Sequence, residues 1–235
     1  MNIILLDKED FISRTRVCLK DRRLRHVLDV HRASPGDALT VGLLNGPVGT
    51  ARITSLSLEA LEMEVELDRQ PPAPLPVTLI LSLPRPKMLK RVLFAAASMG
   101  VKKIFLINSF RVEKSYWNSP LLQEERMRDH LLSGLEQALD TFMPQVLLKP
   151  LFKPFVEDEL PEMVHGSCAL VAHPEAAKPC PRDTNRDVLL AVGPEGGFIA
   201  YEIEKLTSIG FLPVSLGKRP LRVEIALPAL LARIF

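Results

Sequence analysis

The stretch that most restricts the fold of this chain is residues 189–198, where an apolar run ends abruptly in a glycine-rich loop. A helical pattern begins near Ala200, directly after that loop. Glycine allows backbone angles and close approaches that a β-carbon would forbid, and proline fixes one φ angle. A strand ending in such a loop either presents main-chain N–H groups to a ligand or makes a tight strand–helix turn. A second glycine loop at residues 216–224 favours the ligand-binding interpretation.

Residues 77–235 alternate between strand and helix patterns. Buried strands are predicted at residues 77–83, 103–107, 168–172, 188–192 and, more briefly, 211–215. Helices are predicted at residues 87–99, 121–139, 155–163 and 200–209. Such alternation favours an α/β fold, a parallel sheet with helices on both faces. Ligands bind these sheets at the carboxyl ends of the strands, where both glycine loops are expected.

The segment 71–76 contains four prolines in six residues and is predicted to be a stiff linker between two domains. Before it, short apolar runs are separated by turn signals, and residues 61–67 alternate strictly between apolar and polar. We therefore expect a small β-barrel domain at residues 1–70, with strands at 38–41, 49–53 and 61–67 and one helix at 21–31. Residues 77–235 form the second expected domain.

The net charge is only +2, but its distribution is uneven. Residues 14–32 hold seven basic and two acidic side chains, and residues 85–128 hold ten basic and three acidic ones. Residues 129–187 hold ten acidic and five basic side chains. Blocks of one sign favour a polyanionic partner, although a solvated basic surface would look the same. The candidate RNA-binding residues are Arg14, Arg16, Arg22, Arg23, Arg25, Arg85, Lys87, Arg91 and Arg219.

Several classes of protein are disfavoured. No run of 18 apolar residues is present, so we expect no membrane partner. The first residues become acidic too early for a signal peptide, and three cysteines without a Cys-x-x-Cys spacing favour a cytoplasmic protein. Cys168, His173 and Cys180 match no usual zinc spacing, so no metal is expected.

Together, the loops Gly193-Pro194-Glu195-Gly196-Gly197 and Leu216-Gly217-x-Arg219-x-Leu221-Arg222-x-Glu224-x-Ala226 resemble the C-terminal signature of the RsmE family. These proteins are bacterial 16S ribosomal RNA uridine-N(3) methyltransferases of the SPOUT superfamily. Residues 25–28 followed by 35–37 are similar to the family's N-terminal PUA-like barrel. Residues 98–104, and Glu136-Gln137 with Pro144, resemble its middle segments, so the resemblance covers nearly the whole chain.

The resemblance implies S-adenosyl-L-methionine as methyl donor, 16S ribosomal RNA of the small ribosomal subunit as substrate, and a homodimer. It also implies a SPOUT-type parallel sheet with a C-terminal trefoil knot beside a small PUA-like β-barrel. A knot would not be expected from the pattern alone, because knots are almost absent from proteins.

The chemistry assigns roles to the site residues. A uracil imide nitrogen is protonated at neutral pH, so the enzyme needs a base or an electrostatic clamp for the uracil anion. The catalytic candidates are Arg222, which can hydrogen-bond a uracil carbonyl, and Glu224, which could orient Arg222 or take the proton. Glu224 could instead be a carboxylate that stabilises a helix N-terminus. Arg219 is expected to hold phosphate.

The cofactor-binding candidates come from three strand ends, since adenine sites of this kind use main-chain groups and apolar walls. They are Ala172, His173, Gly193, Pro194, Glu195, Gly197, Leu216, Gly217 and Leu221. His173 could equally be a packing histidine.

The chain departs from the family pattern at five positions, Asp29, Asp140, Pro220, Val223 and Ile225. Each replaces a basic, hydroxyl-bearing or N–H-donating residue near the expected RNA or cofactor. Two alternatives therefore stay open. One is a non-catalytic RNA-binding or ribosome-assembly protein of the same fold, and the other is a methyltransferase that acts on a different RNA position.

Overall fold

A computed structural model describes residues 2–235 and divides the chain into two compact units. The N-terminal unit comprises the residues up to Ala73 together with Leu135–Met143. The C-terminal unit comprises Pro74–Gly134 and Pro144–Phe235. The chain therefore passes between the units three times, and only the first passage lies in the proline-rich segment.

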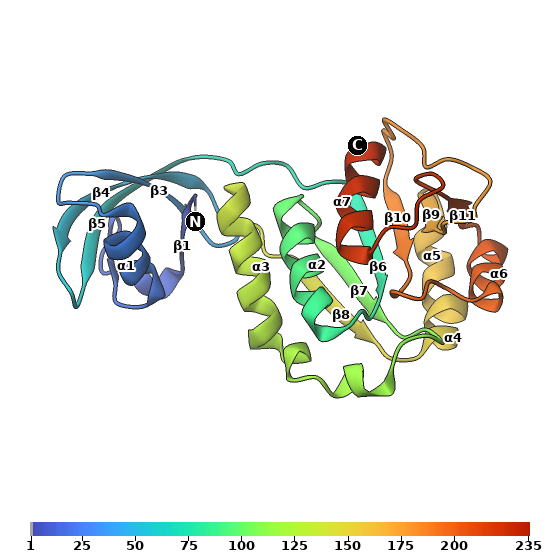
Figure 1. Ribbon diagram of the computed structural model, residues 1–235. Coiled ribbons are helices and arrows are strands. Elements are labelled where there is room, and N and C mark those ends of the chain that lie inside the picture. Colours follow the sequence, from blue (N-terminus) through green and yellow to red (C-terminus); the bar gives the residue numbers. More distant parts are fainter. Residues whose placement is uncertain (1) are drawn as a thin grey trace. The chain divides into compact units, whose positions relative to one another are not determined.

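The N-terminal unit is a curled five-stranded sheet (Figure 1) with the order β1-β3-β4-β5-β2. β1 pairs parallel with β3, and the other pairs are antiparallel. Register shifts in the β4–β5 pair accompany the curl, as β-bulges do. Gly49 is required in this pair, since a Cβ there would lie 1.8 Å from the Glu66 carbonyl oxygen. The strands are β1 Ile4–Leu6, β2 Arg16–Leu19, β3 Ala38–Leu43, β4 Val48–Leu56 and β5 Leu61–Arg69.

One helical segment packs on this sheet. It begins as α1, Arg22–His26, and continues as a π-helical turn, Val27–His31. Leu24 and Val27 are buried in the same core as the inward-facing residues of the five strands. The helix and three strands predicted before the linker are thus confirmed. β1 and β2 were not predicted, because three or four residues are too few to show an alternating pattern.

The segment Leu135–Met143 is part of the N-terminal unit through backbone bonds. The N–H groups of Asn2 and Ile3 both donate to the Glu136 carbonyl, at 2.9 and 3.2 Å. Asn45 N–H donates to the Thr141 carbonyl at 2.8 Å. No composition change marks this segment, so the sequence gives no sign that it leaves the C-terminal unit.

The C-terminal unit is built on a six-stranded, fully parallel sheet with the order β11-β9-β10-β6-β7-β8. Four predicted strands and the short fifth one are confirmed. β8 was not predicted, because as an edge strand it is only half-buried and its apolar run is short. The strands are β6 Val77–Ser82, β7 Lys103–Ile107, β8 Gln145–Lys149, β9 Cys168–Ala172, β10 Val188–Val192 and β11 Leu212–Val214.

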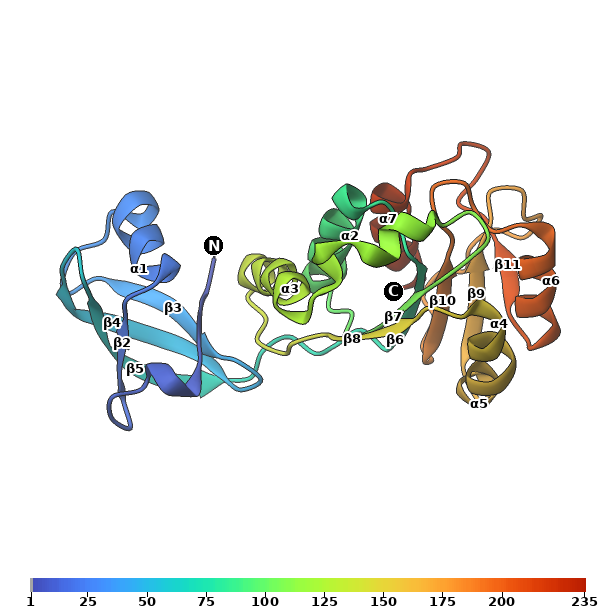
Figure 2. The same cartoon turned by 90° about the horizontal axis from the view of Figure 1, so that it is seen from below.

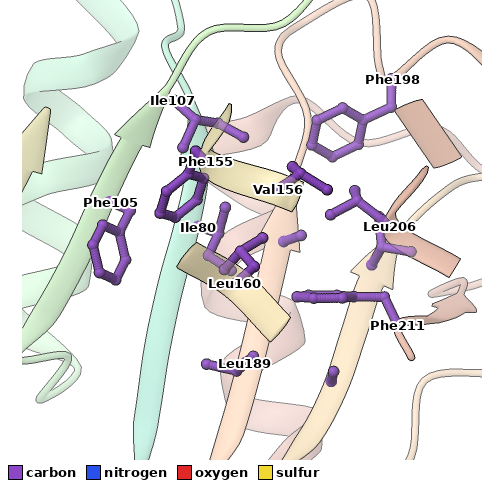
Figure 3. Close-up of a cluster of buried hydrophobic side chains, with 13 residues drawn as sticks. Ile80, Phe105, Ile107, Phe155, Val156, Leu160, Leu189, Phe198, Leu206 and Phe211 are labelled. Atoms are coloured by element: carbon purple, nitrogen blue, oxygen red, sulfur yellow. The ribbon is translucent and has the colours of Figure 1, made fainter. Parts of the chain in front are cut away.

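Helices cover both faces of this sheet (Figure 2), with α2, α3 and α7 on one face and α4, α5 and α6 on the other. Figure 3 shows the core of the second face, where Phe155, Leu160 and Leu206 lie against side chains of the strands. None of the helices in residues 2–235 has the length and apolar character needed to cross a bilayer. The helices are α2 Pro86–Ser98, α3 Glu124–Ala138, α4 Phe152–Pro154, α5 Leu160–Val164, α6 Ala200–Ser208 and α7 Val223–Ile234. Shorter helical turns are Lys8–Asp10, Lys114–Asn118, Pro120–Leu122 and Phe155–Glu159.

The strands β6, β7, β9, β10 and β11 end at the same side of the sheet because all of them are parallel. We call this side the carboxyl edge. The order of the sheet changes direction here, since β9 and β11 lie on one side of β10 and β6 to β8 lie on the other. Such a position is where α/β sheets bind ligands.

Candidate active site

The loop after β10 is a tight turn shaped by its glycines. Gly197 N–H donates to the Pro194 carbonyl at 2.7 Å, and Gly197 has a φ of +72°. A Cβ at Gly193 would lie 2.9 Å from the Phe198 nitrogen, so the turn closes only around a glycine. Phe198 is buried and anchors the far end of the loop. The loop is therefore held in one conformation by its own sequence.

The loop after β11 leads into α7. Ser215 is held on both sides, since its N–H donates to the Lys178 carbonyl at 2.9 Å and its carbonyl accepts from Cys180 N–H at 2.8 Å. Gly217 has a φ of +122°, which side chains disfavour. Arg222 then caps α7, and its carbonyl accepts from the N–H groups of Ile225 and Ala226 at 2.9 and 2.8 Å.

The end of β9 forms the third side of the site. His173 N–H donates to the Val214 carbonyl at 2.9 Å, which extends the β9–β11 pairing by one residue. The His173 Nδ1 accepts from Glu175 N–H at 3.3 Å. The imidazole is thus fixed at the start of the loop, and it is half-buried.

These three strand ends enclose one cavity of about 290 Å³. Its buried walls are apolar and come from Val192, Val214, Val223 and Leu230. All nine residues predicted to bind the cofactor line this cavity. The structure adds further lining residues that the sequence analysis had not assigned to the cofactor, namely Pro174, Gly196, Ser215, Arg219, Pro220 and Ala226. Their position in the same loops as the predicted residues is the sequence feature that could have identified them.

The two catalytic candidates occupy different environments. Arg222 is exposed at the start of α7, and its guanidinium has no hydrogen bond or ion pair among residues 2–235. The Glu224 side chain is only 10% exposed and does not line the cavity. Its Oε1 lies 4.0 Å from a guanidinium nitrogen of Arg91 on α2, and its Oε2 is buried with no hydrogen-bond partner in the described chain. Glu224 therefore faces Arg91 from the first turn of α7. Of the roles that the sequence left open for Glu224, orienting Arg222 receives no support from a contact between the two side chains.

The basic residues at the start of α2 lie beside the glycine loop. The backbone N–H of Arg85 donates to Glu195 Oε1 at 3.0 Å, which joins the start of α2 to the loop after β10. Arg85, Lys87 and Arg91 are all exposed. The structure thus brings three predicted RNA-binding residues to the carboxyl edge, together with Arg219.

Arg23 has a different role. Its guanidinium donates to Asp10 at 2.6 and 2.7 Å, to Asp21 at 2.7 and 3.0 Å, and to the Leu5 carbonyl at 2.7 Å. Arg23 is 8% exposed. Although burial works against ionisation, these carboxylates raise the pKa of Arg23, and hydrogen bonds from Arg23 lower the pKa of Asp21. We therefore withdraw Arg23 from the RNA-binding residues, because its donors are used within the fold.

The other basic residues predicted in the N-terminal unit stay on its surface. Arg16 pairs with Glu62 at 2.8 Å, and Arg22 pairs with Glu136 at 2.6 Å. Arg14 and Arg25 are exposed.

The sequence analysis missed the loop between β7 and the helical turn Lys114–Asn118. Arg111 in this loop donates from its guanidinium to the Gly196 carbonyl. The N–H of Phe110 donates to Glu202 Oε1 at 2.7 Å. The only signal was the position of the loop directly after a predicted strand at the carboxyl edge.

The cavity suits an adenosine-containing cofactor in its chemistry. Its apolar walls can enclose a planar base, and glycine backbone forms its rim, where close approach needs the absence of side chains. Within residues 2–235, no group of three or more histidine, cysteine, aspartate or glutamate side chains is arranged to hold a metal ion.

Comparison with known proteins gives the same family for most of the chain. Residues 71–235 match the family model described as an RNA methyltransferase domain. The chain is 31% identical over 233 residues to the ribosomal RNA small subunit methyltransferase E of Treponema pallidum, covering 96% of this chain and 87% of the relative. This chain belongs to the RsmE family.

Similarity to other members of the RsmE family extends over nearly the whole chain and supports this assignment. The ribosomal RNA small subunit methyltransferase E 1 of Borreliella burgdorferi is 24% identical, covering 96% of this chain and 94% of the relative. The crystal structure of the Neisseria gonorrhoeae enzyme bound to S-adenosyl methionine superposes with a TM-score of 0.75 at 26% identity. It covers 99% of this chain and 95% of the other. The α/β fold with a parallel sheet is thus the fold of the RsmE structures.

Proposed function

We propose that this protein is an S-adenosyl-L-methionine-dependent methyltransferase that methylates the N(3) position of a uridine in 16S ribosomal RNA. The observation that carries the proposal is the cavity between the ends of β9, β10 and β11, because all nine expected cofactor residues line it. Exposed arginines stand beside that cavity in a chain of the RsmE family. The names of its relatives supply the substrate, the RNA of the small ribosomal subunit.

The cofactor is assigned to the cavity by its walls. The loops containing Gly193, Gly197 and Gly217 supply main-chain groups at the rim, and Val192 and Leu230 supply apolar surface for the base. When bound, S-adenosyl-L-methionine supplies an electrophilic methyl group. The solved Neisseria relative is described as bound to this molecule.

Arg222 is assigned to the chemical step. Its side chain is exposed, the guanidinium has no partner in the described chain, and the loop that Arg222 follows lines the cavity. A uracil that loses its imide proton carries negative charge on its carbonyl oxygens. A guanidinium that donates to such an oxygen stabilises the charge as it develops, and this lowers the barrier.

Glu224 is assigned a positioning role. A carboxylate that faces Arg91 across 4.0 Å can hold that guanidinium at the carboxyl edge. Because Glu224 lies in the first turn of α7, its carboxylate also interacts favourably with the helix dipole. Glu224 therefore acts on the RNA through Arg91, because its side chain does not line the cavity.

RNA contacts are assigned to both units. In the C-terminal unit they are Arg85, Lys87, Arg91 and Arg219, and in the N-terminal unit they are Arg14, Arg16, Arg22 and Arg25. Residues 1–70 are assigned to a PUA-like RNA-binding domain and residues 77–235 to the SPOUT methyltransferase domain, of which Leu135–Met143 packs with the N-terminal unit. The support is the exposure of these side chains and the curled form of the N-terminal sheet.

We further assign a trefoil knot to the C-terminal segment. Its support is the contact of α7 with the connection between β9 and β10. Thr184 N–H donates to the Ile234 carbonyl at 2.7 Å, and Arg233 Nε donates to the Cys180 carbonyl at 2.7 Å. These bonds hold a long connection across the helix that the final segment forms.

A homodimer is assigned from exposed apolar side chains on two helices that pack together. Phe94 on α2 is 40% exposed, and Ile225 on α7 is 54% exposed. Apolar patches of this kind mark association surfaces when they are contiguous. A protein that modifies ribosomal RNA is expected to act in the cytoplasm.

The test uses the purified full-length protein with S-adenosyl-L-methionine and unmodified small ribosomal subunits or free 16S ribosomal RNA. Nucleosides from the RNA are then analysed by mass spectrometry, and cofactor binding is measured by calorimetry. The proposal expects 3-methyluridine at one position and one cofactor per chain. Cofactor binding without methyl transfer to either RNA would support the non-catalytic alternative. A different methylated nucleoside would support the alternative target.

A further inference from the structure

An exposed phenyl ring stands beside the glycine loop of the C-terminal unit. Phe110, in the loop after β7, is 78% exposed. Its neighbours Ser109 and Val112 are 3% and 8% exposed, and Val112 N–H donates to the Ser109 carbonyl at 3.0 Å. The ring therefore stands at the tip of a tight turn whose two ends are fixed in the core.

Two contacts fix this turn against the elements of the cavity. The N–H of Phe110 donates to Oε1 of the buried Glu202 at 2.7 Å, while Oε2 accepts from the N–H of Ile199 at 3.0 Å, just before α6. The Arg111 guanidinium donates to the Gly196 carbonyl. A Cβ at Gly196 would lie 2.8 Å from Arg111 Cδ, so Gly196 makes room for this arginine. The ring is thus displayed on rigid backbone next to a loop that lines the cavity.

Two basic residues lie close to Phe110 in the chain. Arg111 follows it directly and Lys114 lies four positions after it, with Glu113 between them, and all three are exposed. The Arg85 backbone is bonded to Glu195 in the same glycine loop. An exposed aromatic side chain among basic residues is the arrangement with which proteins bind unpaired nucleotides. The ring stacks on a base, while the cations contact the backbone phosphates.

We propose that Phe110 is a stacking platform for an unpaired base of the RNA substrate, next to the nucleotide that is methylated. The inference rests on the proposed function, because it takes RNA as the substrate. The exposed cations Arg111 and Lys114 in the same loop favour RNA over an apolar protein surface as the partner. The fixed backbone means that little conformational entropy is lost when a base binds. Stacking on a phenyl ring is tolerant of sequence, so the platform contributes affinity and orientation more than base identity.

The test measures the affinity of the full-length protein for in vitro transcribed 16S ribosomal RNA by filter binding. Phe110→Ala is expected to weaken binding by about five- to a hundredfold, the range found when one stacked aromatic is removed. Phe110→Trp keeps a π-surface and retains binding, whereas Phe110→Leu keeps apolar bulk and does not. Tyr201→Ala removes another exposed aromatic of the same unit and is the matched control, with no expected effect.

Two further measurements separate stacking from other roles. Because the ring carries no charge, Phe110→Ala leaves the salt dependence of RNA binding unchanged, whereas Arg85→Ala reduces its slope. Affinity for S-adenosyl-L-methionine is unchanged, since Phe110 does not line the cavity. Sedimentation velocity checks that the variants keep the oligomeric state of the wild type.

The inference is overturned if Phe110→Ala or Phe110→Leu binds RNA like the wild type. It is also overturned if Phe110→Ala loses RNA affinity only in step with dissociation of an oligomer, because the ring would then lie in a subunit interface. If the wild type methylates RNA and Phe110→Ala binds normally, only this inference fails. The proposed function alone fails if the wild type binds RNA but transfers no methyl group, and if Phe110→Ala weakens that binding. Absence of RNA binding by the wild type overturns both.

Discussion

In the N-terminal unit, the arginine nearest the core is part of the fold, whereas at the carboxyl edge of the C-terminal unit the arginines are exposed around a cavity. Arg23 donates to Asp10, Asp21 and a backbone carbonyl and is 8% exposed. Arg222 is exposed, and its guanidinium has no partner in residues 2–235. Both have other basic residues close by in the sequence, Arg22 and Arg25 for Arg23, and Lys218 and Arg219 for Arg222. The two differ in their surroundings. A buried guanidinium bonded to carboxylates stabilises the fold, whereas an exposed guanidinium is available to bind a ligand.

The largest expected effect is the loss of stability caused by replacing Arg23. Replacing it with alanine leaves the Asp10 carboxylate, whose side chain is 12% exposed, without its cation. Losing one partner of a buried pair costs about 3–5 kcal/mol of unfolding free energy. Urea unfolding of Arg23→Ala measures this loss, with the exposed neighbour Arg25→Ala as control. Equal stability of the two variants, with weaker RNA binding by Arg23→Ala, would return Arg23 to the RNA-binding set.

The next effect is on Arg222. Arg222→Ala should slow methyl transfer by about a hundred- to a thousandfold, the loss typical of one preorganised donor. Arg222→Lys keeps the charge without the planar fork and should recover only part of the rate. Cofactor affinity is measured separately by calorimetry. A parallel loss of cofactor binding and activity would place Arg222 in the cofactor pocket, and normal activity would make it structural.

Two glycines with positive φ angles, Gly36 in the N-terminal unit and Gly217 in the C-terminal unit, allow a direct comparison of the units. Gly217 has a φ of +122° and Gly36 a φ of +97°, and a Cβ at either would meet no atom within 4 Å. Valine at such an angle costs about 1–3 kcal/mol in backbone strain and should displace the loop. Gly217→Val should therefore abolish cofactor binding in calorimetry, while Gly36→Val lowers stability only. Unchanged affinity in a folded Gly217→Val variant removes this loop from the site.

A smaller effect is expected for Arg219. It is exposed and lines the mouth of the cavity, so Arg219→Ala should lower the salt slope of RNA binding by about one unit. Arg69→Ala, which removes an exposed arginine paired with Asp68 in the N-terminal unit, is the control. A slope that stays the same in Arg219→Ala shows that this side chain makes no phosphate contact.

The smallest effect concerns pH. Although burial opposes ionisation, hydrogen bonds from Arg23 lower the pKa of Asp21 below its ordinary value of 3.8. A carboxyl group whose pKa is lowered by folding stabilises the native state above its unfolded pKa and loses this effect as pH falls through the folded value. Thermal unfolding between pH 7 and 3 should show a shallower loss for Asp21→Asn than for the wild type. Parallel curves would contradict the pairing.

Much of the C-terminal unit could be predicted from its sequence, because central parallel strands are buried on both faces. β7, β9 and β10 begin and end at the predicted residues. β9 and β10 are five-residue apolar runs and β7 has four apolar residues after Lys103, and each is bounded by polar or glycine residues. β8 lies at the edge of the sheet and is half-exposed, and its sequence has no apolar run long enough to predict a buried strand. The cavity lining followed from the same logic, because loops after neighbouring parallel strands must meet.

Long-range pairing of charged residues could not be predicted. Arg23 and Arg25 look alike in the sequence, and only the fold shows that one faces Asp10 and the other solvent. Glu224 meets Arg91, which is 133 positions away, rather than its near neighbour Arg222. The turn at Phe110 is held by Glu202, which is 92 positions away. Such contacts depend on which elements the fold brings together, and the local sequence pattern does not determine that.

The central claim is that the cavity and Arg222 together methylate small-subunit ribosomal RNA at a uridine N(3). The most direct test deletes the gene in its host and measures 3-methyluridine in 16S ribosomal RNA by mass spectrometry, with complementation by the wild type or by Arg222→Ala. The account predicts loss of the modified nucleoside on deletion, its return with the wild type, and little or no return with Arg222→Ala expressed at the same level. An unchanged amount of 3-methyluridine after deletion would contradict it.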